Sequence, residues 1–237
     1  MKLVHAGILA LAALSPLAGC TSDVAPPDTS AGRATSSLSL DVTVRASDAY
    51  VLVQADVRDG STSLQLAAGD RLSAGFDGLP ATSTWLQRVG SGYAAELAGR
   101  SDTLLLALLR DDAAAVSAPS TRLTLPPAFD VVAPTTTVSR ASAITLTWSP
   151  TDATREMSLE ATGACIQTLD RTLSHDPGTF TLQPADLFAK PGEQLQPCEL
   201  VLTLRRAGGA VAFDPALGPG GRATLTQERV VRIATTP

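Results

Sequence analysis

The sequence is poor in the residues on which most catalytic and metal sites depend. Its 237 residues include two histidines and three cysteines, and aromatic residues make up 4% of the chain. His175 lies in the turn-forming sequence Ser-His-Asp-Pro-Gly, and the other histidine, His5, lies in an N-terminal segment that we expect to be removed. Any Ser-His-Asp triad would have to use His175, and a single histidine cannot build a zinc site beside paired cysteines. We therefore expect no catalytic residue, no metal and no cofactor, and we predict that the chain is not an enzyme.

Nucleotide-binding, hydrolase and calcium motifs are missing as well. The sequence contains no GxSxG element, no phosphate-binding loop and no dinucleotide fingerprint. Residues 218–221 read GPGG, but no Lys-Ser or helix follows them, so we interpret them as the loop of a hairpin. Two pairs of acidic residues, Asp56 with Asp59 and Asp111 with Asp112, lack the spacing of a calcium-binding loop. A turn and a strand end account for these aspartates without a metal.

Basic residues are few and dispersed. Lysine and arginine number 18, against 23 aspartates and glutamates. Removing residues 1–19 takes away Lys2 and leaves 17 basic against 23 acidic residues, a net charge of −6. A surface of this charge disfavours nucleic acid and anionic lipid headgroups as partners.

The N-terminus has the three parts of a secretory signal. Lys2 supplies the charged start, residues 8–14 form an apolar core, and small residues follow. A core of this length makes a signal but is too short for a stable membrane span. Residues 17–20 read Leu-Ala-Gly-Cys, which resembles the lipobox of bacterial lipoproteins.

The lipobox resemblance implies that Cys20 is processed. In that family the cysteine sulfur receives a diacylglyceryl group, the chain is cut just before the cysteine, and the new amine is acylated. The recognition sequence would be Leu17, Ala18 and Gly19, after a signal peptide of residues 1–19. Two or three acyl chains, palmitate among them, bind a bilayer almost permanently. Thr21 stands where an aspartate retains enteric lipoproteins at the inner membrane. The resemblance therefore implies a bacterial cell envelope, with the outer membrane favoured over the inner.

Residues 20–36 have the composition of a flexible tether. They are rich in Pro, Ser, Thr and Gly and almost free of large apolar side chains, so they cannot bury enough surface to offset the entropy of ordering. Fully extended, the segment would reach roughly 55 Å. We expect the folded part of the chain to stand away from the bilayer.

Residues 37–126 show the alternation of half-buried strands. Leu38, Leu40, Val42 and Val44 alternate with polar residues, and further short apolar runs are separated by turn formers. The run 103–110, TLLLALLR, is short and lies between turn signals, which favours a buried central strand over a helix. This spacing of strands predicts an antiparallel β-sandwich domain.

Residues 127–237 repeat this pattern and add two cysteines. One predicted strand, residues 144–148, places Trp148 on its core face, and another, which begins at Cys198, places that cysteine on its core face. In an exported chain we expect Cys165 and Cys198 to form a disulfide. Closing a loop of this length stabilises a fold by about 3 to 4 kcal/mol on the chain-entropy model.

A resemblance supports the sandwich prediction for this second half. Residues 144–150, ITLTWSP, resemble the second strand of fibronectin type III and related immunoglobulin-like modules, in which a Trp covers the core and a Pro follows. The second half as a whole is similar to lipoproteins of predatory and soil bacteria, and that resemblance carries no activity with it. Prolines at 126, 127 and 134 favour two domains, 37–126 and 127–237. One larger sandwich, with residues 126–136 crossing between its sheets, is the alternative.

The chain offers two ways to bind a partner. Phe76, Trp85 and Tyr93 could form an aromatic platform for a glycan, although a chain with so few rings is expected to use them in its core. Edge strands could accept a strand of another protein. We predict a non-enzymatic envelope lipoprotein, a binding, adhesion or structural module held on the membrane by Cys20, with an envelope protein or glycan as partner. An accessory subunit of an envelope secretion or assembly complex is the alternative.

Overall fold

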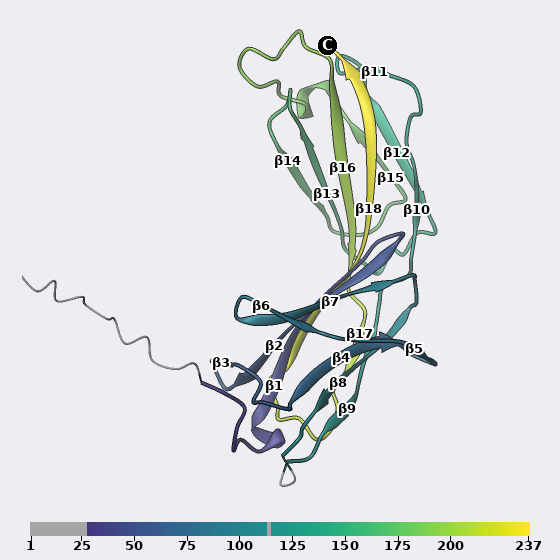
Figure 1. The fold of residues 1–237 in the computed structure, drawn as a ribbon. Helices are drawn as coiled ribbons and strands as arrows, with labels where there is room; N and C mark the ends of the chain where they lie inside the picture. Colours follow the sequence, from purple (N-terminus) through teal and green to yellow (C-terminus); the bar gives the residue numbers. More distant parts are fainter. Residues whose placement is uncertain (1–27, 113–114) are drawn as a thin grey trace, which may run out of the picture.

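The computed structural model describes residues 28–112 and 115–237, and these residues fold into strands (Figure 1). The only helical turns among them are the 3-10 segments η1 (Thr35–Ser37) and η2 (Pro184–Asp186). Within the same residues no helix is long and apolar enough to cross a membrane. The predicted all-β fold class is confirmed.

The strands form three sheets. The largest contains, in order across it, β14 (Leu169–Leu173), β13 (Met157–Gly163), β16 (Cys198–Ala207), β18 (Arg222–Thr236), β1 (Leu38–Ala46), β2 (Tyr50–Asp59), β7 (Gly92–Ala98) and β6 (Gln87–Val89), with β11 (Val138–Ser139) beside β18 and β3 (Thr62–Leu64) beside β2. The second contains β17 (Ala210–Ala212), β9 (Ala118–Thr124), β8 (Thr103–Leu109), β4 (Arg71–Phe76) and β5 (Leu79–Trp85). The third contains β10 (Asp130–Val132), β12 (Ile144–Ser149) and β15 (Thr179–Leu182).

The first core, in what we call the first lobe, lies between the five-stranded sheet and the part of the large sheet from β18 to β7. Each strand contributes alternate residues, so that β1 buries the four apolar residues predicted from its sequence. β8 is the central strand of its sheet and buries Leu104, Leu106 and Leu108. The interpretation of residues 103–110 as a strand is therefore confirmed.

The second core, in the second lobe, lies between the three-stranded sheet and the part of the large sheet from β14 to β18. β12 buries Ile144, Leu146 and Trp148 and exposes the residues between them, as its alternation predicts. Opposite them, β16 buries Leu200, Leu202 and Leu204. Each lobe is thus a β-sandwich.

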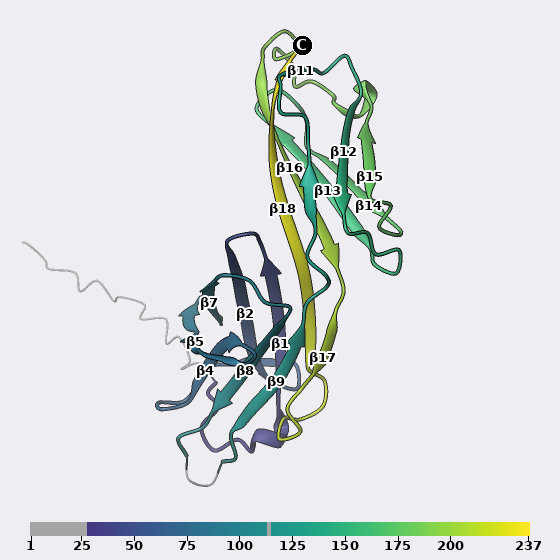
Figure 2. The same cartoon turned by 90° about the vertical axis from the view of Figure 1, so that its right-hand side faces the viewer.

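β18 belongs to both lobes. Its residues 222–227 pair in parallel with β1, and its residues 226–235 pair antiparallel with β16. Figure 2 shows β18 running from the first lobe into the second. The sheets are therefore not antiparallel throughout as predicted, because β18 comes from a distant part of the chain and no hairpin fixes its direction relative to β1.

Two segments lie elsewhere than the sequence suggested. Residues 28–36, assigned to the flexible tether, are packed on the first lobe, where Ser30 and Thr35 are buried. The segment between β16 and β18 returns to the first lobe and adds Leu217 to its core. GPGG at 218–221 is consequently not a hairpin loop, since β17 pairs with β9 while β18 pairs with β1. The two cores thus do not divide the chain cleanly at residue 126.

Candidate functional site

The predicted lipidation site lies outside the described residues. This holds for Cys20 and for the lipobox residues Leu17, Ala18 and Gly19. Asp28 belongs to the segment that packs on the first lobe.

A buried ion pair fixes this N-terminal segment. Arg110 Nε lies 2.8 Å from Asp70 Oδ2, and both side chains are almost fully buried. The Arg110 guanidinium also donates hydrogen bonds to the backbone carbonyls of Ser30 and Arg33, and the Ser30 hydroxyl donates one to Asp70. A buried ion pair is stable only when further hydrogen bonds satisfy both partners. Residues 28–37 supply such bonds, and we call Ser30, Asp70 and Arg110 the clamp.

A cleft of about 360 Å³ opens in the first lobe where the chain passes from β5 to β6. Its polar and aromatic lining residues are Asp70, Arg71, Trp85, Gln87 and Tyr93. Trp85 is 44% exposed there, whereas the other tryptophan, Trp148, is buried. Phe76 and Tyr93 are buried too. The expectation that the aromatic residues pack into the core is therefore met by Phe76 and Tyr93, and Trp85 departs from it.

Arg71 stacks on the exposed tryptophan. Its Cζ atom lies 5.3 Å from the centroid of the Trp85 ring. Ser73 of β4 pairs with Trp85 of β5, and Arg71, two residues before Ser73, projects on the same face of the sheet. A stacked guanidinium keeps its in-plane N–H groups available for a carboxylate or phosphate. Among the described residues, no acidic side chain forms a salt bridge with Arg71.

The acidic residue that lines the cleft, Asp70, already has hydrogen-bond partners within the protein. Both oxygens of Asp70 accept hydrogen bonds, Oδ1 from the Asp111 backbone and Oδ2 from Ser30, and Arg110 neutralises the charge. The Tyr93 hydroxyl accepts a hydrogen bond from the Leu66 N–H at 2.7 Å, which leaves its own proton to donate. The cleft therefore offers one aromatic surface, one guanidinium and hydroxyl and amide groups to a ligand.

A larger groove, of about 450 Å³, lies on the outer face of β18, β1, β2 and β7. Its aspartates already have partners, because Asp41 binds Arg58 and Asp56 accepts a hydrogen bond from Ser63. Its one aromatic lining residue, Tyr93, is buried. We therefore regard the Trp85 cleft as the better candidate site.

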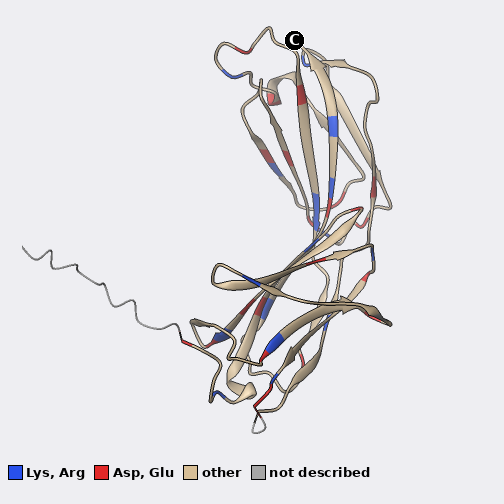
Figure 3. Ribbon diagram, in the orientation of Figure 1, with Lys and Arg blue, Asp and Glu red and all other residues tan. Residues whose placement is uncertain are grey.

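The described residues contain no group of three or more His, Cys, Asp or Glu side chains placed to hold a metal ion. Among the aspartates considered as calcium ligands, Asp59 forms a salt bridge with Arg33, and the backbone N–H of Asp111 donates a hydrogen bond to Asp70. Basic and acidic positions are interspersed over both lobes in Figure 3. The absence of a nucleic-acid partner stays a prediction.

His175 lies exposed in the turn between β14 and β15. Its Nδ1 is 3.3 Å from the hydroxyl of Ser174. The neighbouring Asp176 is buried, and its carboxylate faces Arg206 and the Trp148 indole N–H instead. The structure thus assembles no Ser-His-Asp triad at His175, and the lack of enzymatic activity stays a prediction.

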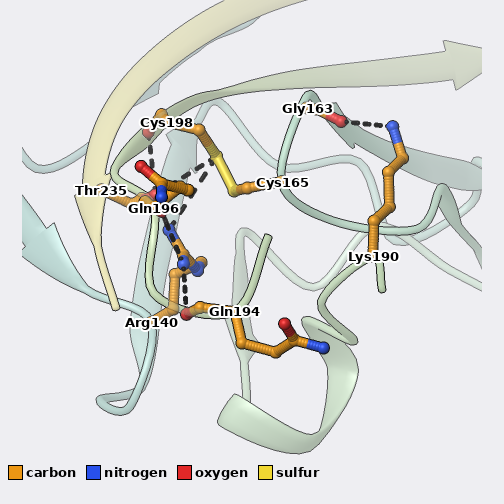
Figure 4. The surroundings of a disulfide bond; sticks show 8 residues. All are labelled: Arg140, Gly163, Cys165, Lys190, Gln194, Gln196, Cys198 and Thr235. Atoms are coloured by element: carbon orange, nitrogen blue, oxygen red, sulfur yellow. Dashed lines mark hydrogen bonds between the residues drawn. A yellow bond between two sulfur atoms is a disulfide. The ribbon is translucent and has the colours of Figure 1, made fainter. Parts of the chain in front are cut away.

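The structure contains the predicted disulfide between Cys165 and Cys198, whose Cα atoms are 5.9 Å apart (Figure 4). Beside it, the buried Arg140 donates hydrogen bonds to the backbone carbonyls of Gln194 and Gln196. The disulfide and Arg140 together hold the loop that precedes β16. Every contact around them is made within the protein, and we assign the disulfide and Arg140 a structural role.

A fully buried arginine ties the second lobe together at the end next to the first. Arg206 of β16 donates to the carbonyls of Pro127 and Pro150 and to the Asp176 carboxylate, at 2.5 to 2.7 Å. Asp176 also accepts hydrogen bonds from the Trp148 indole and the Asp152 backbone. The network joins β16, the segment after β9 and the β14–β15 turn.

A second buried arginine connects the two lobes. Arg229 of β18 donates to the Phe129 carbonyl and lies 2.9 Å from Asp48, in the turn between β1 and β2. The guanidinium groups of Arg206 and Arg229 both lie over the Phe129 ring, with their Cζ atoms 4.6 and 5.1 Å from its centroid. Burial lowers the pKa of Arg229, and the positive charges of Arg100 and Arg206 lower it further.

Asp214 fastens the segment between β17 and β18 to the first lobe. Its carboxylate accepts hydrogen bonds from the backbone and hydroxyl of Ser120 and from the Ala216 N–H. Burial alone would raise the pKa of Asp214, but these hydrogen bonds outweigh it, so that the pKa lies below its ordinary value.

Sequence reasoning missed both arginine networks and the stack on Trp85. Arg206 continues the alternation of Leu202 and Leu204 on the core face of β16, so the strand period could have identified it as buried. No comparable signal exists for the clamp, because Asp70 and Arg110 are paired only by the fold.

Comparison with known proteins gives likenesses of low score. No protein-family model and no curated protein sequence matches this chain. A cytokine receptor complex is 18% identical, with 81% of this chain and 95% of that chain covered and a TM-score of 0.30. The FN1–FN3 domains of chicken CNTN1 are 12% identical, with 90% and 69% covered and a TM-score of 0.29.

Bacterial proteins are among the similar structures. A Salmonella alpha-2-macroglobulin mutant is 12% identical at a TM-score of 0.29, and the match covers 90% of this chain. The chain spans only 16% of that protein's length. The Yersinia pseudotuberculosis adhesin InvE is 12% identical, with 84% and 60% covered and a TM-score of 0.22. At these scores the likenesses carry no statement about function.

Proposed function

We propose that this chain is a non-enzymatic lipoprotein of a bacterial cell envelope, in which a lipidated Cys20 holds a ligand-binding module close to the membrane. The lipobox sequence at 17–20 supports the anchor. The observation that carries the proposal is the clamp, which fastens the chain to the first lobe through Ser30, ten residues after that cysteine. A lipid on Cys20 would thereby be connected directly to a folded lobe.

The clamp shortens the reach of the anchor. Because residues 28–37 are bound to the lobe, only residues 21–27 link it to Cys20. Fully extended, these seven residues span at most about 25 Å, less than half the reach of a tether that extends to residue 37. The proposal therefore places the first lobe, with its Trp85 cleft, near the lipid headgroups. Thr21, which follows Cys20, favours the outer membrane.

Fractionation of cells that make the full chain tests the anchor. We expect the wild-type protein in the membrane fraction and Cys20→Ser in the soluble fraction. Thr21→Asp is the matched control, since it keeps the cysteine; in an enteric host it should stay membrane-bound and move from the outer to the inner membrane. A wild-type protein that is soluble, or a Cys20→Ser protein that stays on the membrane to the same extent, would refute the proposal. A stable stoichiometric protein partner in pull-downs would favour an accessory subunit of an envelope complex.

A further inference from the structure

We propose that the Trp85 cleft binds a sugar that carries a carboxylate group, such as a uronic acid unit of an acidic glycan. This inference deepens the binding part of the proposed function and does not require the lipid anchor. It rests on three features of the cleft, which are the exposed ring, the guanidinium stacked on it and the neutralised aspartate at its base.

The exposed ring supplies the surface for a sugar. Trp85 keeps 44% of its surface exposed, whereas the other aromatic residue that lines the cleft, Tyr93, is buried. Tyr50 and Phe188 are exposed as well, but neither lines this cleft. A tryptophan of this kind is a large apolar plate with a rigid position, and pockets for small ligands combine such plates with a few placed polar groups. The C–H face of a pyranose ring can pack against the part of the Trp85 ring that Arg71 does not cover. Gln87 and the Tyr93 hydroxyl line the same cleft and can bind sugar hydroxyl groups.

The guanidinium selects an acidic sugar. Arg71 is held over the Trp85 ring at 5.3 Å, so its orientation is set before a ligand arrives. Its planar N–H groups match the two oxygens of a carboxylate. Within residues 28–112 and 115–237, no carboxylate forms a salt bridge with Arg71, whereas Arg33, Arg58 and Arg110 all have one.

The remaining charge in the cleft does not repel an anion strongly. Asp70 is the one acidic lining residue, and its carboxylate is buried against Arg110 and hydrogen-bonded on both oxygens. With Asp70 neutralised in this way, Arg71 gives the open part of the cleft a positive charge. The overall acidity of the chain therefore does not extend into this site.

Tryptophan fluorescence provides a direct test on the full chain in detergent. The chain has two tryptophans, and Trp148 is buried, so a ligand in the cleft should change the emission of Trp85. Trigalacturonic acid is the probe, and its methyl ester is the matched neutral ligand. We expect a saturable change with the acid and a binding constant at least about tenfold weaker with the ester, because one charged bidentate hydrogen bond is lost.

Two variants and one control locate the site. Arg71→Gln should abolish the preference for the acid over the ester, and Trp85→Ala, followed by calorimetry, should remove binding of both. Tyr50→Ala changes a similarly exposed aromatic residue on β2, outside the cleft lining, and should bind like the wild type. Circular dichroism confirms that each variant is folded.

No saturable change with the acid up to about 10 mM, a far weaker affinity than specific sites show, would overturn the inference. Equal affinities for the acid and the ester would also overturn it. The same holds if Arg71→Gln keeps the wild-type preference for the acid over the ester, or if an acidic peptide binds more tightly than the sugar. Failure here leaves the fractionation result for Cys20 unaffected.

Discussion

Replacing Asp176 with asparagine should destabilise the second lobe strongly. The carboxylate accepts four hydrogen bonds: the Trp148 indole and the Gly178 N–H bind Oδ1, while the Asp152 N–H and Arg206 bind Oδ2. The side-chain oxygen of asparagine can still accept the hydrogen bonds from Trp148 and Gly178. Its NH₂ group then faces the Asp152 N–H and the Arg206 guanidinium, which are both donors. The variant also leaves the fully buried Arg206 without its counter-ion, and breaking a buried pair from one side costs about 3 to 5 kcal/mol. We therefore expect a loss of about 3 to 5 kcal/mol.

Urea unfolding followed by fluorescence measures this loss. A Trp85→Phe background leaves Trp148 as the only tryptophan, so the signal reports on the second lobe. Asp170→Asn is the matched control: it makes the same charge change at an exposed position of the same lobe, where substitutions stay within about 0.5 kcal/mol. If Asp176→Asn cost less than about 1 kcal/mol, no more than an ordinary substitution, the reasoning from the buried ion pair would be wrong.

Three further predictions concern other parts of the molecule. Asp70→Asn should break the clamp and speed proteolysis within residues 28–37 by about tenfold or more, since local opening governs cleavage. The control variant Asp28→Asn should be cleaved at the wild-type rate. Equal cleavage rates for the two variants would show that the clamp does not hold this segment. Replacing both Cys165 and Cys198 with serine should cost the second lobe about 2 to 5 kcal/mol in urea unfolding, and an unchanged midpoint would show that the disulfide contributes nothing. Because the folded-state pKa of Asp214 is depressed, its contribution is full above the unfolded-state pKa and is lost as the pH falls through the folded-state pKa. The stability difference between wild type and Asp214→Asn should therefore be largest at neutral pH and shrink below about pH 4; a difference that stays constant from neutral pH to about pH 3 would count against this.

The strands were predictable because their burial follows local alternation. Residues 38–44 and 144–148 each place apolar side chains at every second position, and the structure buries these side chains. Which strands become neighbours was not predictable in the same way. β18 pairs with β1 more than 170 residues away, from Asp41↔Arg222 onward, and nothing in the alternation of either strand encodes the pairing or its parallel direction.

Composition is a poor guide to burial where polar residues are buried by partners that are distant in the sequence. The segment 28–36 looks like a tether because it lacks apolar side chains, yet Ser30 is fully buried through hydrogen bonds to Asp70 and Arg110. The candidate site was predictable only in part. Trp85 was identified as a candidate platform from its residue type, but the partner that gives the cleft its charge, Arg71, is brought to it by the pairing of β4 with β5.

The central claim, that Cys20 carries the anchor, is tested most directly by the intact mass of the protein extracted from membranes. We expect a chain that begins at Cys20 and carries the added mass of a diacylglyceryl group and an amide-linked acyl chain, with this addition absent from Cys20→Ser. An unmodified wild-type chain, or one that keeps residues 1–19, would show that Cys20 does not carry a lipid anchor.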